Sequence, residues 1–242
     1  SNKLYLYSSC CGSGTIYYTS SEKGTFFATH TSFLSKLRCY SISTSGISEI
    51  IRFGANYSSQ TLLNELFKLP LASSLYIKDE VIIGNRSYYS KIINSQPISN
   101  SLEEALENTI NSLQIKKASI LFSTGIDSTI IAQKLINKID NRSFYMKESQ
   151  KSNFTSNLLK EAEGKGMLIN KVNLNININT LKETIKSYSL PTVDFSILPT
   201  YQILSTSLSF SDDVLEGTGG DAWFGFSELK NLKYWIILKH LG

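Results

Sequence analysis

The stretch that decides the fold is Ala118-Ser119-Ile120-Leu121-Phe122-Ser123-Thr124-Gly125-Ile126-Asp127-Ser128. Its first five residues are largely apolar, which is typical of a strand buried on both faces of a parallel sheet. A loop of small residues follows, and the apolar stripe of a helix comes after it. This order of strand, loop and helix predicts a ligand site where the strand ends.

Strands and helices continue to alternate on both sides of this stretch. Ser101 and Glu104 form a capping box that starts one helix before it. The segments that follow are predicted as helix 128–139, strand 143–146, helix 154–164, strand 168–174, helix 180–188 and strand 214–215. Such alternation predicts the α/β class with a doubly wound, mostly parallel sheet.

The first part of the chain has a different pattern, with short β-rich runs separated by turn residues. The predicted strands are 4–7, 15–18, 25–28, 74–77 and 81–83, and the predicted helices are 31–37 and 45–53. A stretch rich in Ser and Asn then suggests a linker. We therefore predict a β-rich domain at 1–89, a linker at 90–100 and an α/β domain at 101–242.

Composition limits the classes of function. The 242 residues include 24 Lys and Arg against 20 Asp and Glu, and the net charge of +4 is too small to indicate nucleic-acid binding. Apolar runs fall short of the ~18 residues of a membrane helix. Three cysteines, Cys10, Cys11 and Cys39, have no metal-site spacing and suit a reducing cytosol. We expect a cytoplasmic protein that binds neither nucleic acid nor membrane.

The loop at Ser123–Ser128 has the chemistry of a phosphate site. Backbone N–H groups at a helix N-terminus attract anions, Gly125 permits close approach, and Ser123 and Ser128 add hydroxyl groups. Asp127 would repel a phosphate unless Mg²⁺ lay between them, so the loop fits a nucleotide pyrophosphate with Asp127 on the metal. It lacks the form of a Walker loop. The structural alternative is an ordinary Ser/Gly turn capped by Asp.

The motif SxGxDS after an apolar strand resembles the pyrophosphatase loop of the ATP-dependent adenylating enzymes. Two further segments are similar to the asparagine synthetase family within that group. They are Leu190 to Tyr201, which resembles a stretch leading into an "IPTY" helix, and Val214 to Phe226, which resembles a GxGxDExFGGY signature. The resemblance implies a sheet of the adenine-nucleotide α-hydrolase type.

The N-terminal part is similar, at the level of pattern, to the later half of an amidotransferase domain of the N-terminal-nucleophile type. That activity needs an N-terminal cysteine, and position 1 is Ser. The resemblance thus implies a partial or degenerate amidotransferase-like domain without glutaminase activity. It also implies that the second domain is truncated at its C-terminus.

The resemblance assigns roles to residues of this chain. Asp127 and Asp221 would hold Mg²⁺, and Asp194 and Thr218 are candidates for catalysis, Thr218 standing where relatives have an acid. The residues implied in binding ATP are Ser123, Thr124, Gly125, Asp127, Ser128, Tyr145, Met146, Gly217, Gly219 and Gly220.

The implied activity is adenylation of a carboxylate by ATP, with release of pyrophosphate, followed by attack of ammonia or an amine. Three alternatives stay open: an asparagine synthetase, an intramolecular amide-forming cyclase of the β-lactam synthetase or lasso-peptide cyclase type, and an inactive module that binds a nucleotide or a partner. The implied ligands are ATP, Mg²⁺ and a small carboxylate or peptide. A homodimer, or a partner that supplies missing domain parts, is also possible.

Overall fold

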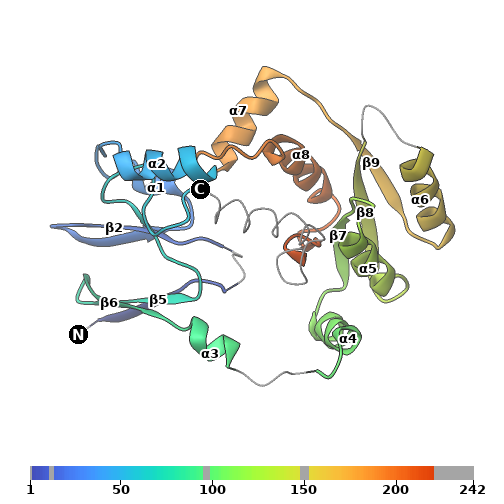
Figure 1. Ribbon diagram of the computed structural model, residues 1–242, viewed down its shortest axis with the longest axis horizontal. Helices are drawn as coiled ribbons and strands as arrows, with labels where there is room; N and C mark the ends of the chain where they lie inside the picture. The colour runs from blue at the N-terminus through green and yellow to red at the C-terminus, as the bar shows by residue number, and fades with distance from the viewer. Residues whose placement is uncertain (1, 11–13, 95–98, 148–152, 221–242) are drawn as a thin grey trace, which may run out of the picture. The chain divides into compact units, whose positions relative to one another are not determined.

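A parallel four-stranded sheet organises one part of the chain in the computed structural model, which describes residues 2–10, 14–94, 99–147 and 153–220 (Figure 1). All neighbouring strands in this sheet are parallel, in the order β10-β7-β8-β9. The strands are β7 (Lys117–Leu121), β8 (Asp140–Lys147), β9 (Ile169–Asn173) and β10 (Val214–Leu215). The predicted α/β class with a parallel sheet is confirmed.

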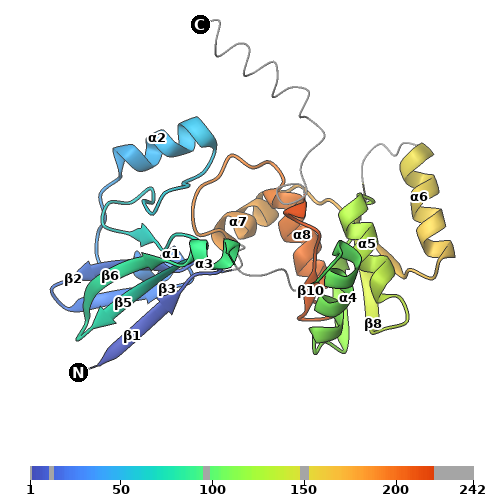
Figure 2. The ribbon, with the colours of Figure 1, turned by 60° about the horizontal axis from the view of Figure 1, so that its bottom comes forward.

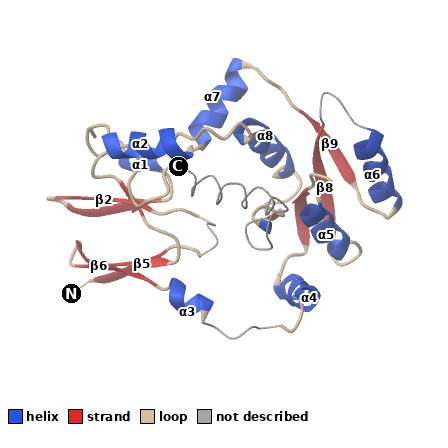
Figure 3. Cartoon of the chain, in the orientation of Figure 1, coloured by secondary structure: helices blue, strands red, loops and turns tan. Residues whose placement is uncertain are grey.

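Both faces of this sheet are covered, because the side chains of each strand alternate between two cores. On β7, Ile120 joins a cluster with Ala132 of α5 (Ile126–Leu135) and Leu159 of α6 (Asn153–Gly164). The next residue, Leu121, packs instead against a cluster that contains Ile203 of α8 (Ile197–Ser207). Figure 3 accordingly shows α5 and α6 on one side of the sheet and α8 on the other.

The strand order reverses between β7 and β10. From β7 the chain continues through β8 to β9 in one direction, and β10 then pairs with the opposite edge of β7. In open α/β sheets, ligands bind outside the carboxyl ends of the strands at such a reversal. The loops that follow β7 and β10 are therefore the places to look for a site.

Helix α4 (Leu102–Ser112) begins at the predicted cap, since the Ser101 hydroxyl accepts a hydrogen bond from Glu104 N at 3.1 Å, while the Glu104 carboxylate accepts from Asn100 N and not from Ser101 N. Its acidic side chains pair with lysines of α5 and of the turn after it: Lys134 lies 2.9 Å from Glu103 and 2.8 Å from Glu107, and Lys138, beyond the end of α5, also pairs with Glu107. Hydrogen bonds from these two lysines lower the pKa of Glu107 from 4.5 to about 2.

This shift predicts acid sensitivity. A carboxyl group with a lower pKa in the folded state stabilises the fold above about pH 4.5, and that stabilisation is lost as the pH falls toward 2. We expect Glu107→Gln to lower the urea midpoint at pH 6 and to change it much less at pH 2. The control is Asp212→Asn, because the Asp212 carboxylate forms no ion pair with any described residue. Equal effects of Glu107→Gln at both pH values would contradict the assignment.

The other part of the chain contains two three-stranded antiparallel sheets, which Figure 2 shows from a second direction. Their strands, in sheet order, are β1 (Lys3–Tyr7), β5 (Ser73–Lys78) and β6 (Val81–Ser87), and β3 (Gly24–Ala28), β2 (Tyr17–Ser21) and β4 (Phe67–Lys68). Leu6, Leu75 and Ile77 form the core beside the first sheet, and Tyr17, Leu34 and Leu66 form a core beside the second. The β-rich pattern predicted for residues 1–89 is thus present.

Two helices, α1 (Thr31–Leu34) and α2 (Thr44–Phe53), accompany these sheets. Gly46 of α2 is buried against the segment around Thr61, and a Cβ added at Gly46 would lie 2.1 Å from the carbonyl oxygen of Thr61. Asn56 binds the same turn of α2, because its Nδ2 donates to the carbonyl oxygen of Gly46 at 2.9 Å. Glycine is therefore required at this position by the close approach of two backbone segments.

The predicted linker 90–100 is helical at its start, where a loop was expected, and the boundary between residues 98 and 99 that separates the two units lies within it. Residues 90–93 belong to α3 (Tyr89–Ile93), and β6 extends to Ser87, four residues beyond the predicted strand. Tyr88 fixes this turn to the first sheet, since its N–H donates to Ala72 at 2.7 Å and its hydroxyl donates to the carbonyl of Ser8. Composition suggested a loop here because it does not register such long-range hydrogen bonds.

The chain divides into two units, which differ from the predicted domains in where residues 177–197 belong. The first unit comprises residues 1–98 and 177–197, and the second comprises 99–176 and 198–242. Helix α7 (Ile178–Ser187) and the segment after it thus belong with the β-rich part. Leu190 packs into the core around Leu34, and Val193 N donates to Gly54 O at 3.1 Å.

Two further observations concern the class of protein. None of the helices in the described residues is long and apolar enough to cross a membrane. Cys39 is a free, exposed thiol and Cys10 is half-buried, whereas Cys11 lies outside the described residues.

Candidate functional site

The predicted phosphate loop connects β7 to α5. The N–H of Phe122 donates to Phe144 O at 2.8 Å, which extends the pairing of β7 with β8 to the start of the loop. Thr124 then has a φ of 63°, a left-handed conformation that is uncommon for residues other than glycine. Gly125 caps α5 without a side-chain hydrogen bond to the first turn. The loop therefore turns sharply and leaves the N–H groups of the first turn of α5 without a side-chain cap.

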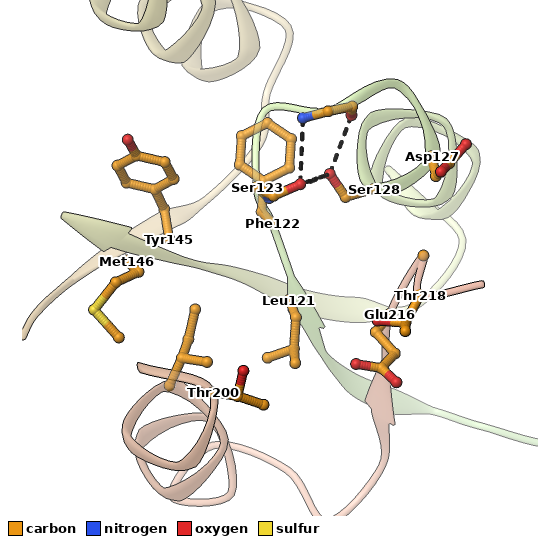
Figure 4. A pocket seen from close by; sticks show the side chains of 13 residues that line it. Leu121, Phe122, Ser123, Asp127, Ser128, Tyr145, Met146, Thr200, Glu216 and Thr218 are labelled. Atoms are coloured by element: carbon orange, nitrogen blue, oxygen red, sulfur yellow. Dashed lines mark hydrogen bonds between the residues drawn. The ribbon is translucent and has the colours of Figure 1, made fainter. Parts of the chain in front are cut away.

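The two loop serines hold this turn together (Figure 4). Ser128 Oγ accepts from Ser123 N at 3.2 Å and donates to Gly125 O at 3.1 Å. The hydroxyl of Ser123 lies 3.1 Å from Ser128 Oγ and accepts from Gly125 N at 3.3 Å. Since the Ser128 proton goes to Gly125 O, Ser123 donates to Ser128. Both hydroxyl protons thus shape the loop, and the N–H groups at the start of α5 are the donors available to an anion.

We expect Ser128→Ala to loosen the loop, because it removes three of these contacts at a buried side chain. The free energy of unfolding of the second unit should fall by about 1–2 kcal/mol. Hydrogen exchange of the 123–128 amides, followed by mass spectrometry, measures the change. Thr129→Val is the matched control, since Thr129 Oγ1 donates to the same Gly125 O at 2.7 Å but has no bond to Ser123. Equal deprotection in both variants would contradict the role given to Ser128.

The glycine turn after β10 lies against the start of α5. A Cβ added at Gly217 would lie 2.8 Å from Asp127 Cβ and 3.0 Å from Ser128 N. A Cβ at Gly220 would lie 2.5 Å from Asp127 Oδ2, and Gly219 has a φ of 95°. Two segments far apart in sequence thus meet at Asp127, and glycine is needed at 217, where two of the nearest atoms are backbone atoms.

A pocket of about 470 Å³ opens at this edge of the sheet (Figure 4). Eight residues singled out from the sequence line it: Ser123, Gly125, Asp127, Ser128, Tyr145, Met146, Gly217 and Thr218. The carboxyl ends of β7, β8 and β10 all contribute, as expected for a strand-order reversal. Its volume is in the range of sites for small molecules and cofactors.

The remaining site predictions have different outcomes. Thr124, Gly219 and Gly220 belong to the two loops but are not among the residues that line the pocket. Asp221, the second predicted metal ligand, lies outside the described residues, directly after Gly220. Its role stays a prediction.

Asp194 is part of the first unit and is absent from the pocket lining. Its Oδ1 accepts a hydrogen bond from Ser196 N at 2.8 Å, and the Ser196 hydroxyl and N–H together lower the pKa of the Asp194 carboxyl. The side chain thus forms a local turn and is a weaker base than an ordinary aspartate. A catalytic role for Asp194 stays a prediction.

Sequence reasoning missed five lining residues: Leu121, Phe122, Thr200, Ile203 and Glu216. Glu216 directly follows β10, and this position at a strand end was the available signal. Thr200 and Ile203 come from α8, whose covering of the site depends on the tertiary fold. Two carboxylates, Asp127 and Glu216, are among the described residues that line the pocket, and no Lys, Arg or His is among them.

The donor set around Asp127 suits Mg²⁺ better than a softer metal. One carboxylate, nearby hydroxyl groups and space for a polyphosphate match the few protein ligands that Mg²⁺ takes beside substrate phosphates and water. No group of three or more His, Cys, Asp or Glu that could hold a metal by itself occurs among the described residues. A metal here would therefore need oxygen ligands from its substrate.

Comparison with known proteins adds no relative: no protein-family model matches the chain, and no curated protein is significantly similar to it in sequence.

Proposed function

We propose that the protein is an ATP-dependent ligase that forms carbon–nitrogen bonds, activating a carboxylate as an acyl-adenylate. The observation that carries the proposal is the meeting of the Ser123–Ser128 loop and the Gly217–Gly220 turn at one carboxylate, beside a pocket at the strand-order reversal. A polyanion fits the uncapped start of α5, and a metal cation would offset the charge of Asp127.

In this proposal the β- and γ-phosphates of ATP bind the N–H groups of the loop and of the first turn of α5. Asp127, together with Asp221, would hold Mg²⁺, and the metal would supply positive charge to offset that of the departing pyrophosphate. The adenine lies along the end of β8, beside Tyr145 and Met146, which line the pocket. Backbone N–H donors fixed before the reaction stabilise charge as it develops, without reorganisation of the site.

The reaction has two steps. A substrate carboxylate oxygen attacks the α-phosphorus, and the bond to the β-phosphate oxygen breaks, which releases pyrophosphate. An amine then attacks the acyl carbon, AMP leaves, and the amine loses a proton. The resemblance of the two loops to the asparagine synthetase family supports this reaction class. With it we propose an adenine-nucleotide α-hydrolase type of sheet, an amidotransferase-like first unit and a cytoplasmic location.

Thr218 favours an intramolecular cyclase as the second candidate. It lines the pocket where the resemblance implies an acid in asparagine synthetases. A cyclase presents its amine on the same molecule as its activated carboxylate, so it depends less on a protein group that captures free ammonia.

Exchange of labelled pyrophosphate into ATP tests the proposal. The full chain, Mg²⁺ and ATP are incubated with aspartate or with peptides and N-substituted amino acids. Exchange that depends on aspartate supports an asparagine synthetase, and exchange that depends on the larger acids supports the cyclase. Binding of α,β-methylene-ATP without exchange for any acid would instead support an inactive nucleotide-binding module, and absence of both would reject the site.

A further inference from the structure

The pocket has a second carboxylate, Glu216, which lies outside the phosphate loop and has no role in the proposed binding of ATP. It follows Leu215, which packs into the α5 and α6 core, and strand alternation turns the next side chain to the opposite face. That face carries Leu121, Thr200 and Ile203, which line the same pocket. In the view of Figure 4, the carboxylates of Asp127 and Glu216 lie on opposite sides of Thr218.

The charge of Glu216 has no counterpart in the described part of the pocket. The side chain is exposed and forms no ion pair with any described residue, and no basic side chain is among the described residues that line the pocket. A carboxylate beside an anionic nucleotide is unfavourable unless a cation lies between them. A metal on Asp127 would offset one negative charge, and the charge of Glu216 would remain.

A primary ammonium group suits Glu216 better than a second metal ion. Mg²⁺ needs an octahedral set of oxygen ligands, whereas the polar neighbours on this side of the pocket are the hydroxyls of Thr200 and Thr218. An alkylammonium group needs only a few acceptors for its N–H groups, and its carbon chain can contact Leu121 and Ile203.

We infer that Glu216 binds the ammonium group of the second substrate, which is therefore a primary amine with an alkyl chain. The inference deepens the proposed function, because it assigns the amine partner of the adenylated carboxylate. Glu216 and the Thr200 hydroxyl accept its hydrogen bonds, and the apolar side chains select a carbon chain over free ammonia.

The test compares three probes of equal length, n-propylammonium, n-propanol and propionate, by calorimetric titration of the full chain. We expect the ammonium to bind about fivefold more tightly than the alcohol, the range for a solvent-accessible ion pair, with weaker binding at higher salt. Glu216→Gln should remove this preference, whereas Asp212→Asn, an acid-to-amide change outside the pocket lining, should retain it. An unchanged preference in Glu216→Gln, or no preference in the wild type, overturns the inference.

Two further measurements separate the alternatives. Mn²⁺ affinity that falls in Glu216→Gln would make Glu216 a metal ligand and overturn the inference. The same titrations are repeated with α,β-methylene-ATP and Mg²⁺. An amine preference that depends on Glu216, in a protein that does not bind the nucleotide, would reject the proposed function and retain the ammonium site.

Discussion

Asp127→Asn should reduce ATP–pyrophosphate exchange by at least about a hundredfold, which is the largest functional effect we expect. The variant keeps the shape of the side chain beside Gly217 and Gly220 but removes the charge. In the proposed site that charge holds Mg²⁺, whose neutralisation of phosphate charge is worth several kcal/mol in the transition state. The measurement is the initial rate of exchange with an acid that supports it in the wild type.

The control for this experiment is Asp212→Asn, which removes the same charge from an exposed position outside the pocket lining. It should exchange at the wild-type rate. Hydrogen exchange of the amides in α5 verifies that Asp127→Asn leaves the fold intact. Wild-type exchange in a folded Asp127→Asn protein would remove Asp127 from the reaction.

Gly46→Ala should lower the free energy of unfolding of the first unit by roughly 2–3 kcal/mol, the largest stability effect we expect. The new Cβ would lie 2.1 Å from Thr61 O and 3.1 Å from Leu62 Cα, and both neighbours are backbone atoms. Relief requires α2 to move away from this segment, which disrupts the hydrogen bond from Asn56 to Gly46 O. The greater helix propensity of alanine, about 1 kcal/mol, offsets only part of the cost.

Hydrogen exchange resolved by mass spectrometry measures this effect within the unit, through the protection of the 44–53 amides. Gly84→Ala is the matched control in the same unit, because a Cβ at Gly84 has no atom within 4 Å. Its effect should stay within about 0.5 kcal/mol. Equal protection in Gly46→Ala and Gly84→Ala would show that the approach of α2 to Thr61 is not tight in solution.

Local pattern sufficed for the α/β class because buried parallel strands and capped helices have signals within a few residues. Ile120 and Phe122 mark a buried strand without reference to any neighbour, and Ser101 with Glu104 defines a helix start. Local pattern could not predict that residues 177–197 belong to the first unit. Leu190 belongs to a core whose other members, such as Leu34, lie more than a hundred positions earlier.

The same distinction between local pattern and long-range packing applies to the candidate site. Residues beside a strand end, such as Ser123, Asp127 and Gly217, were found because parallel strands bring their carboxyl ends to one edge. The shared role of Ser123 and Ser128 in shaping the loop was missed, since the sequence shows two hydroxyls but not their partners. Thr200 belongs to the segment that resembles the "IPTY" stretch, but its place in the lining was not predicted because only the packing of α8 brings it to the pocket.

The assignment of residues 177–197 to the first unit bears on how the chain folds during synthesis. The ribosome delivers the β-rich segments first, then three strands of the parallel sheet, and only afterwards α7 and Leu190. The core around Leu34 therefore lacks Leu190 while the 78 intervening residues (99–176) are synthesised. At the usual ~5–20 residues per second this delay lasts several seconds, a period in which a nascent chain is exposed to chaperones and proteases.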